Sequence, residues 1–298
     1  MNLDSDQALV SIVIPTYNHA DFLKEAITSV IDQTYSNWEA IVVNNYSDDD
    51  TIEIVKSFSE PRIHLFNFHN NGIIGAARNH GILHARGKFL AFLDSDDSWL
   101  PDKLERCLQA LDENTDLVCH ALHCFGDIEK NMFCGPASNA TFDALLNKGN
   151  CLTPSAVVVR KQAISLVEGF SEEKKFVTSE DYHLWIKLAQ SGARMKFIND
   201  ILANYRIHAG NQSGAVLKHL DSVLHVIQSF YWENKHTSIL TTIKMRRRYA
   251  IAYYGAARAM QKSFQFAKAW PLLLRSFLYW PFIARNYLSI IFNLFKRN

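Results

Sequence analysis

Apolar residues form two different patterns along the first hundred residues of the chain. Short continuous apolar runs, typical of buried strands, alternate with stretches in which apolar residues recur every three or four positions, as on one helix face. These patterns predict strands over residues 8–15, 38–44, 62–68 and 88–94, and helices over residues 21–33, 47–58 and 73–85. Strands that alternate with helices indicate a doubly wound, mainly parallel α/β sheet, whose ligands bind beyond the carboxyl ends of the strands.

The pattern changes beyond residue 100. Pro101 stands where the first turn of another helix would begin. Further strands are predicted over residues 152–160, 195–199 and 201–208, and a further helix over residues 179–192. From about residue 215 the periodicity is helical to the end. We therefore predict an α/β domain over residues 1–214 and a helical extension over residues 215–298.

Charge divides the chain at nearly the same place. Residues 216–298 hold thirteen Lys and Arg against two acidic residues, a net charge of +11, while the rest holds 18 basic and 28 acidic residues, a net charge of −10. Such a split indicates two regions that face different partners, and a basic region often faces the phosphates of lipid headgroups or nucleic acid.

The final segment, residues 269–298, is rich in leucine and aromatic residues. Arg275, Pro281 and Arg285 interrupt it, so it is not expected to span a membrane, which takes about 20 apolar residues. Three interpretations are open: docking on a membrane surface, packing against the α/β domain, and binding of nucleic acid. We favour the membrane surface, because it explains both the charge and the aromatic residues.

Cysteine usage and the N-terminus favour a reducing, cytoplasmic setting. The five cysteines lack disulfide-like spacing, and no basic region followed by an apolar stretch opens the chain. The run CHALHC, residues 119–124, could be a metal site. A strand is the favoured interpretation, because its alternation would send these side chains to opposite faces.

Three carboxylates, Asp94, Asp96 and Asp97, follow the predicted strand over residues 88–94. Crowded carboxylates raise one another's pKa unless a cation neutralises them, and hard cations such as Mn²⁺ or Mg²⁺ take oxygen ligands. A metal held by only one or two carboxylates usually completes its shell with phosphate and water, which suggests a nucleoside diphosphate. The alternative is a turn that caps the helix near Pro101.

The ordered motifs of the chain resemble the family 2 glycosyltransferases, which are inverting enzymes of the GT-A fold that use nucleotide sugars. The resemblance covers roughly residues 9 to 213. It rests on four stretches: VSIVIPTYNHADFLKEAITSVIDQTYSNWEAIVV, NNGIIGAARNHGILHARGKFLAFLDSDDSWLPDKL, SEDYHLWIKLAQSG and YRIHAGNQS. It implies a GT-A type sheet with the helical region as a C-terminal extension.

The resemblance assigns the strand-end carboxylates to the metal and the donor. Asp94, Ser95 and Asp96 match the family's DxD motif, with Asp94 towards the ribose. Asp96 and Asp97 match the positions nearest the metal and the diphosphate. His208 is similar to a family histidine that reaches the metal or the diphosphate, and a surface histidine after a strand is its alternative.

Two further stretches supply the implied catalytic base and donor contacts. Asp181, beside Glu180, matches the general base that acts on the acceptor hydroxyl. The alternative interpretation is that Asp181 is an acidic residue in the first turn of a helix, where the positive end of the helix dipole stabilises its negative charge. Arg78 and Asn79 resemble the family's nucleotide-side residues, and a solvated helix arginine is the competing interpretation.

The nucleoside side shows one departure from the family. Pro15, Thr16 and Tyr17 end the first predicted strand, where the backbone would approach the nucleoside. After the second strand the family has two aspartates, the second of which meets the uracil, whereas this chain has Asn44 and Asn45. Asparagine both donates and accepts hydrogen bonds, so a uridine donor does not follow from the resemblance.

The predicted function is that of an inverting, Mn²⁺- or Mg²⁺-dependent glycosyltransferase. A lipid-linked or glycan acceptor at the inner face of the membrane, as in surface polysaccharide assembly, would suit the basic extension, and no nucleic-acid partner is expected. The alternatives are a silent nucleotide-sugar-binding module and a membrane scaffold. The chain holds neither the G-x-G-x-x-G fingerprint nor a P-loop, which argues against a dehydrogenase and an NTPase.

Overall fold

The computed structural model describes residues 8–127, 129–208, 215–233 and 238–295. Two compact units are present. The sheet unit comprises Met1–Phe142, Cys151–Glu173 and Glu180–Ala209, and the helical unit comprises Asp143–Asn150, Lys174–Ser179 and Gly210–Asn298. The predicted domain boundary falls beside residues 209–214, which lie outside the described residues, and it stays a prediction.

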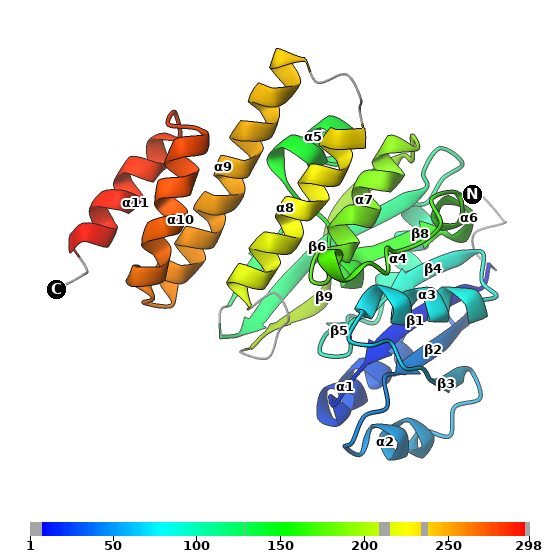
Figure 1. Ribbon diagram of the computed structural model, residues 1–298. Helices are drawn as coiled ribbons and strands as arrows, with labels where there is room; N and C mark the ends of the chain where they lie inside the picture. Colours follow the sequence, from blue (N-terminus) through cyan, green and yellow to red (C-terminus); the bar gives the residue numbers. More distant parts are fainter. Residues whose placement is uncertain (1–7, 128, 209–214, 234–237, 296–298) are drawn as a thin grey trace. The chain divides into compact units, whose positions relative to one another are not determined.

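The described part of the sheet unit contains one nine-stranded sheet, coloured from blue to yellow-green in Figure 1. Its strands are β1 (Val10–Thr16), β2 (Trp38–Asn44), β3 (Ile63–Asn67), β4 (Phe89–Phe92), β5 (Ser98–Trp99), β6 (Leu117–Gly126), β7 (Lys130–Met132), β8 (Val157–Arg160) and β9 (Met195–Ile207). The order is β3-β2-β1-β4-β8-β6-β9-β5, with β7 paired to β6.

The directions of the strands show which strands end at the same edge of the sheet. Strands β3, β2, β1 and β4 are mutually parallel, which confirms the predicted α/β fold class. Strand β8 is antiparallel to both β4 and β6, and β9 is parallel to β6. Therefore β4 and β9 run the same way, and their carboxyl ends share one edge of the sheet.

Helices follow the strands of the first hundred residues as predicted, whereas the short helix over residues 161–166 was not predicted. Those of the sheet unit are α1 (Ala20–Ile31), α2 (Thr51–Ser57), α3 (Ile74–His84), α4 (Lys103–Ala110), α6 (Lys161–Leu166) and α7 (Glu180–Gln190). Helix α3 packs on β1 through Gly81, where an added Cβ would lie 2.4 Å from a methyl of Val13. The small residues of α3 therefore let its backbone approach the sheet closely.

Two predictions differ from the structure in detail. The strand predicted over residues 152–160 is limited to β8, because Pro154–Ala156 form a 3-10 helix. The two strands predicted over residues 195–199 and 201–208 form the single strand β9. Its pairing with β6 shifts register between Cys119 and Leu122, so the extra residues around Asn199 are accommodated as bulges rather than as a break. The strand expected over the CHALHC run is confirmed as part of β6.

The helical unit contains α5 (Phe142–Lys148) apart from its first residue, α8 (Val216–Glu233), α9 (Ile239–Lys262), α10 (Phe266–Tyr279) and α11 (Ala284–Phe295). Helices α9, α10 and α11 lie side by side, with α10 between the other two (Figure 1). Their apolar core is centred on Ala257, Ala269 and Leu273. Among the described helices, none has the length and apolar character needed to cross a membrane.

Candidate active site

The carboxylates predicted as a cation site lie at the shared edge of the sheet. Asp94, Asp96 and Asp97 belong to the turn between β4 and β5, and the backbone N–H of Asp97 donates to the carbonyl of Asp94. The end of β9 reaches the same turn through Arg206 and His208. The topology thus brings together residues that are more than a hundred positions apart in sequence.

Asp94 is part of a buried ion-pair network. Arg78 Nη2 lies 2.7 Å from Asp94 Oδ1, and Arg78 Nη1 lies 2.5 Å from Glu180 Oε1. The Arg78 side chain is only 2% exposed and Glu180 is buried. Arg78 therefore fixes the turn after β4 to the first turn of α7, and its two terminal nitrogens are committed to carboxylates.

Replacing Arg78 by methionine should lower the free energy of unfolding of the sheet unit by about 3–5 kcal/mol, because it leaves buried carboxylates without their counter-charge. Urea unfolding followed by tryptophan fluorescence measures this loss. Arg106→Met is the matched control, because the pair between Arg106 and Asp200 is exposed and such pairs contribute little. Equal stability of the two variants would contradict the buried network.

Asp97 is held by the protein on both carboxylate oxygens. Ser155 Oγ donates to Asp97 Oδ2 at 2.6 Å, and the backbone N–H of Arg206 donates to Oδ1 at 2.9 Å. Ser155 Oγ also accepts from the backbone N–H of Asp94 at 3.2 Å. Burial, with Asp96 and Asp94 nearby, raises the pKa of Asp97 well above its usual range. Its hydrogen bonds make Asp97 a fixed part of the turn.

Asp96 faces the imidazole of His208, with Nε2 3.1 Å from Oδ2. Burial, and then the charge of Asp94, raise the pKa of Asp96, while the hydrogen bond from His208 lowers it. A divalent cation would hold this carboxylate ionised, and the oxygen and nitrogen donors fit Mn²⁺ or Mg²⁺. Within the described residues no three His, Cys, Asp or Glu side chains cluster as metal ligands. Phosphate oxygens and water would complete the shell.

Asp181 lies in the first turn of α7, beside Glu180. Burial, and then the charge of Glu180, raise the pKa of Asp181 to about 7, against the lowering effect of Arg78. A carboxylate with a pKa near neutrality suits a general base, because it can accept a proton and release it again. Arg78 thus holds the predicted base and the DxD turn in one cluster.

A residue that the sequence analysis did not single out, His19, also contacts the DxD turn. His19 Nδ1 lies 2.9 Å from Ser95 Oγ, and the ring stands edge-on to Phe22 with centroids 5.6 Å apart. Phe22 lies beneath both the guanidinium of Arg206, 4.7 Å away, and the ring of His208, 5.1 Å away. Cationic and imidazole groups therefore gather around the carboxylates of the turn.

His19→Ala should weaken nucleoside diphosphate binding by about 2- to 12-fold, which corresponds to one hydrogen bond that orders the DxD turn. Calorimetric titration of His19→Ala, Ser95→Ala and the double variant forms a mutant cycle. We expect the double variant to lose no more affinity than the stronger single variant. Additive losses would show that the contact between His19 and Ser95 has no effect on binding.

The nucleoside-side residues lie at the ends of β1 and β2. Thr16 is buried and its carbonyl accepts from the backbone N–H of Asn45, while Tyr17 is 52% exposed. Asn45 Oδ1 accepts from the backbone N–H of Asn70 at 3.0 Å. Pro15 lies within β1 and is buried. The structure thus groups the predicted strand-end residues beside one loop.

The departure from the family at Asn44 has a structural reason. Asn44 is fully buried, and its Nδ2 donates to Asn67 Oδ1 at 2.9 Å on the neighbouring strand. Its Oδ1 accepts from both the backbone N–H and the hydroxyl of Ser47. An ionised aspartate could not donate to Asn67, so the amide at position 44 fits this pair of strands.

Asn79 is engaged away from the DxD turn. Its Nδ2 donates to the carbonyl of Phe170 and to Glu172 Oε1, both at 2.8 Å, and its Oδ1 accepts from the backbone N–H of Phe170. These bonds tie α3 to the loop that precedes α7. The structure therefore separates Asn79 from Arg78, whose partners are Asp94 and Glu180.

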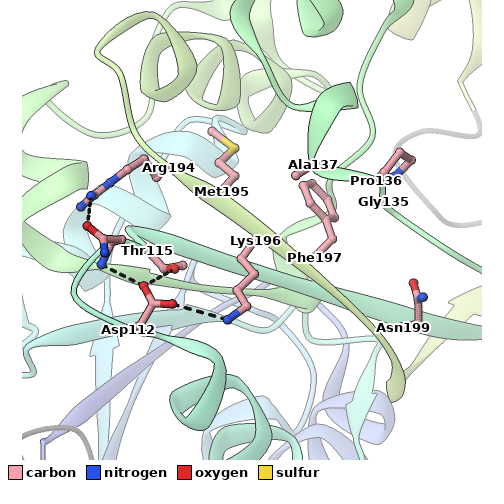
Figure 2. Close-up of a pocket in the computed structure, with 11 residues that line it drawn as sticks. Asp112, Thr115, Gly135, Pro136, Ala137, Arg194, Met195, Lys196, Phe197 and Asn199 are labelled. Atoms are coloured by element: carbon pink, nitrogen blue, oxygen red, sulfur yellow. Dashed lines mark hydrogen bonds and ion pairs between the residues drawn. The ribbon is translucent and has the colours of Figure 1, made fainter. Parts of the chain in front are cut away.

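A pocket of about 600 Å³ lies elsewhere in the sheet unit, around the N-terminal ends of β6 and β9. Figure 2 shows Lys196 directed towards Asp112, and the atoms of that pair are 3.5 Å apart. Arg194 donates to Asn114 at the same pocket. The last residue of β9 that lines the pocket, Asn199, is nine residues before His208, which corresponds to at most about 30 Å along an extended strand. The pocket is therefore not part of the carboxylate site.

The profile of the family described as glycosyl transferase family 2 matches residues 11–157 of this chain. Over 231 residues the chain is 34% identical to the UDP-Glc:alpha-D-GlcNAc-diphosphoundecaprenol beta-1,3-glucosyltransferase WfgD of Escherichia coli. That match covers 76% of this chain and 87% of WfgD.

Two solved structures share the fold. TarS 1–349 of S. aureus, in complex with UDP-GlcNAc, is 18% identical with a TM-score of 0.66, over 95% of this chain and 88% of that one. The mannosyltransferase PcManGT of Pyrobaculum calidifontis, in complex with GDP-Man and Mn²⁺, is 16% identical with a TM-score of 0.58, over 97% and 88%. The fold is thus the expected GT-A fold. Together with the sequence matches, it shows that the chain belongs to glycosyl transferase family 2 and is a glycosyltransferase.

Proposed function

We propose that this glycosyltransferase moves a sugar from a nucleotide-sugar donor to an acceptor hydroxyl, with inversion at the anomeric carbon and with a divalent metal. The observation that carries the proposal is the cluster in which Arg78 joins the DxD turn, at Asp94, to the helix turn that presents Asp181. One carboxylate near the acceptor and another near the diphosphate are the two groups that a single displacement needs.

Each side chain then has a distinct task. Asp96 and His208 would hold Mn²⁺ or Mg²⁺, with Asp97 fixing the turn from behind. When bound, the metal supplies positive charge to the departing nucleoside diphosphate. Asp181 takes the proton of the acceptor hydroxyl as the hydroxyl oxygen attacks the anomeric carbon from the face opposite the diphosphate.

The nucleoside is proposed to lie over the ends of β1 and β2. Tyr17, which is exposed, and Asn45, which is partly exposed, supply the contacts there, while Pro15 and Thr16 shape the backbone. Ser95 and Asp94 would contact the sugar and ribose side of the donor. Because Asn44 is occupied by Asn67 and Ser47, base recognition would rest on Asn45. The backbone N–H of Asn70 already occupies Asn45 Oδ1, so the contact with the base would come from Asn45 Nδ2.

We also propose a lipid-linked glycan as the acceptor, in assembly of a surface polysaccharide at the inner face of the membrane. The relative WfgD is named for a diphosphoundecaprenol-linked sugar, which supports an acceptor of this class. The basic residues of the C-terminal region supply the complementary charge for a diphosphate or an anionic lipid. No nucleic-acid partner is proposed.

The test is transfer itself. Purified protein is incubated with Mn²⁺, a prenyl-diphosphate-linked sugar and UDP-, GDP-, dTDP- and CDP-sugars in turn, and products are identified by mass spectrometry. We expect one donor to yield a product whose new linkage has inverted anomeric configuration by NMR. Nucleotide binding without turnover of any donor would instead favour a silent binding module, the second candidate, which Asn44 and Asn45 leave open.

A further inference from the structure

Helix α11 packs with its polar face inwards. Its buried residues are Asn286, Ser289 and Asn293, each at most 4% exposed. An ordinary surface helix buries its apolar face and exposes its polar one. In α11 this order is reversed, although Ile290 reaches the apolar core of the helical unit.

Two sets of hydrogen bonds accompany this reversal. Asn286 Nδ2 donates to Ser276 Oγ of α10 at 2.7 Å, and Ser276 Oγ donates to the carbonyl of Ala250 in α9. Gln261 Nε2 of α9 donates both to the carbonyl of Ser289 and to Asn293 Oδ1. Helix α11 is therefore held against α9 and α10 by polar contacts as well as by Ile290, and such polar contacts are typical of helices in an apolar medium.

The outward faces of α10 and α11 are apolar. On α10, Trp270, Leu274 and Leu278 recur at four-residue spacing and are 39%, 54% and 63% exposed. On α11, Leu288 is 69% and Ile291 is 49% exposed. Other exposed apolar residues of α11 are Tyr287, Phe292, Leu294 and Phe295, and Phe282 is exposed in the connection between the two helices. Exposed large apolar residues that gather on two adjacent helices mark an interaction surface.

The positive charges of the helical unit favour an anionic partner. Residues 238–295 contain nine Lys and Arg and no Asp or Glu. Arg275 on α10 and Arg285 on α11 are exposed among the apolar side chains, and Lys268 is exposed near the start of α10. A second copy of this chain would bring like charges together, whereas an anionic lipid surface complements them.

We propose that α10 and α11 form a membrane-docking surface whose apolar faces enter the headgroup and acyl boundary of an anionic bilayer. Arg275 and Arg285 would contact lipid phosphates, and the polar seam of Ser276, Asn286 and Asn293 would stay inside the helical unit. This inference deepens the proposed function, because it identifies the surface that would place the enzyme beside a lipid-linked acceptor. Membrane binding is measured without donor or acceptor, so its failure is distinct from failure of transfer.

The experiment is sedimentation of the full chain with vesicles of phosphatidylcholine alone and with an equal mixture of phosphatidylcholine and phosphatidylglycerol. We expect binding to the mixed vesicles, and at least about tenfold weaker partitioning for the double variant Leu288→Glu, Ile291→Glu, which loses apolar burial. The control Leu83→Glu, Leu166→Glu changes leucines on the sheet unit that are 75% and 74% exposed, and it should bind like the wild type.

Charge is tested separately with Arg275→Glu, Arg285→Glu, which should weaken binding to the mixed vesicles by about tenfold or more while the apolar face is intact. Circular dichroism confirms that each variant is folded. The proposal is overturned if the wild type stays in the supernatant with both vesicles, or if the α11 variant binds as its control does. A dimer by light scattering that the α11 variant alone dissolves, with vesicle binding unchanged, would identify a second copy as the occupant instead.

Discussion

Replacing Asp181 by asparagine is expected to slow sugar transfer by about 10³-fold while donor binding is retained. The amide cannot take the proton of the acceptor hydroxyl, and removal of a positioned base typically costs 10²- to 10⁴-fold. The substitution keeps the size of the side chain beside Glu180 and Arg78, so the ion-pair network at the turn of α7 is preserved. Single-turnover transfer and calorimetric titration of the nucleoside diphosphate measure the two effects.

The matched control is Asp200→Asn, an exposed carboxylate on β9 whose partner is Arg106, and this variant should transfer sugar at the wild-type rate. The pH profile is a second readout. Because the raised pKa of Asp181 is about 7, its charged form predominates only above that pH, so kcat/KM should fall tenfold per pH unit below it. Wild-type activity in Asp181→Asn, or a flat profile between pH 5 and 8, would refute the assignment of the base.

Replacing Asp96 by alanine is expected to remove metal-dependent donor binding and to lower transfer by about 10³-fold or more, because the diphosphate loses the charge that stabilises its departure. Asp96 differs from its neighbours in its partners. Arg78 neutralises Asp94, and Ser155 and Arg206 occupy Asp97, whereas Asp96 faces His208. Manganese titration followed by electron paramagnetic resonance, in the presence of the nucleotide, measures the loss.

Asp200→Ala serves as the control for this variant as well, since it removes a carboxylate from the same unit outside the DxD turn. His208→Ala is expected to weaken manganese binding less than Asp96→Ala. Loss of the carboxylate removes a negatively charged oxygen ligand, which hard cations prefer, whereas loss of the imidazole removes a nitrogen ligand without negative charge. Unchanged manganese binding in Asp96→Ala would place the cation elsewhere.

Local pattern was enough to predict the order of strands and helices up to Asp94, whereas β5, β7 and α6 were not predicted. The apolar run that ends in Asn44 and the run before Asp94 are buried strands because only continuous apolar segments can occupy the centre of a sheet with both faces covered. In open α/β sheets, ligands bind beyond the carboxyl ends of the strands, so Asp94 and Asp96 were predicted to lie at a ligand-binding edge. These inferences need no information about distant contacts.

The partners of the site residues could not be predicted in the same way. Arg78 and Glu180 are 102 positions apart, and His19 and Ser95 are 76 apart, so the contacts depend on how the sheet closes. A lone histidine after a strand carries no periodic signal that would distinguish it from a surface residue. The Asn44 and Asn67 amide pair likewise follows from the register of β2 and β3, which the sequence does not reveal.

Helix α11 shows a further limit of periodicity. An amphipathic pattern shows that one face of a helix is polar and the other apolar, but it does not show which of the two faces is buried in the protein. The burial of Asn286 and the exposure of Leu288 became evident only from the packing against α9 and α10. The surrounding medium decides which face is buried, and this is why we infer a lipid surface for this helix.

Metal-dependent binding of the donor nucleotide is tested most directly by calorimetric titration of the wild-type protein with UDP, GDP, dTDP and CDP, each with Mn²⁺ and then with EDTA. We expect that one of these nucleotides binds in the presence of Mn²⁺ and that its binding disappears with EDTA, because the diphosphate would complete the metal shell at Asp96 and His208. Binding of a nucleotide that is equally tight with EDTA, or no binding of any of the four, would contradict this expectation.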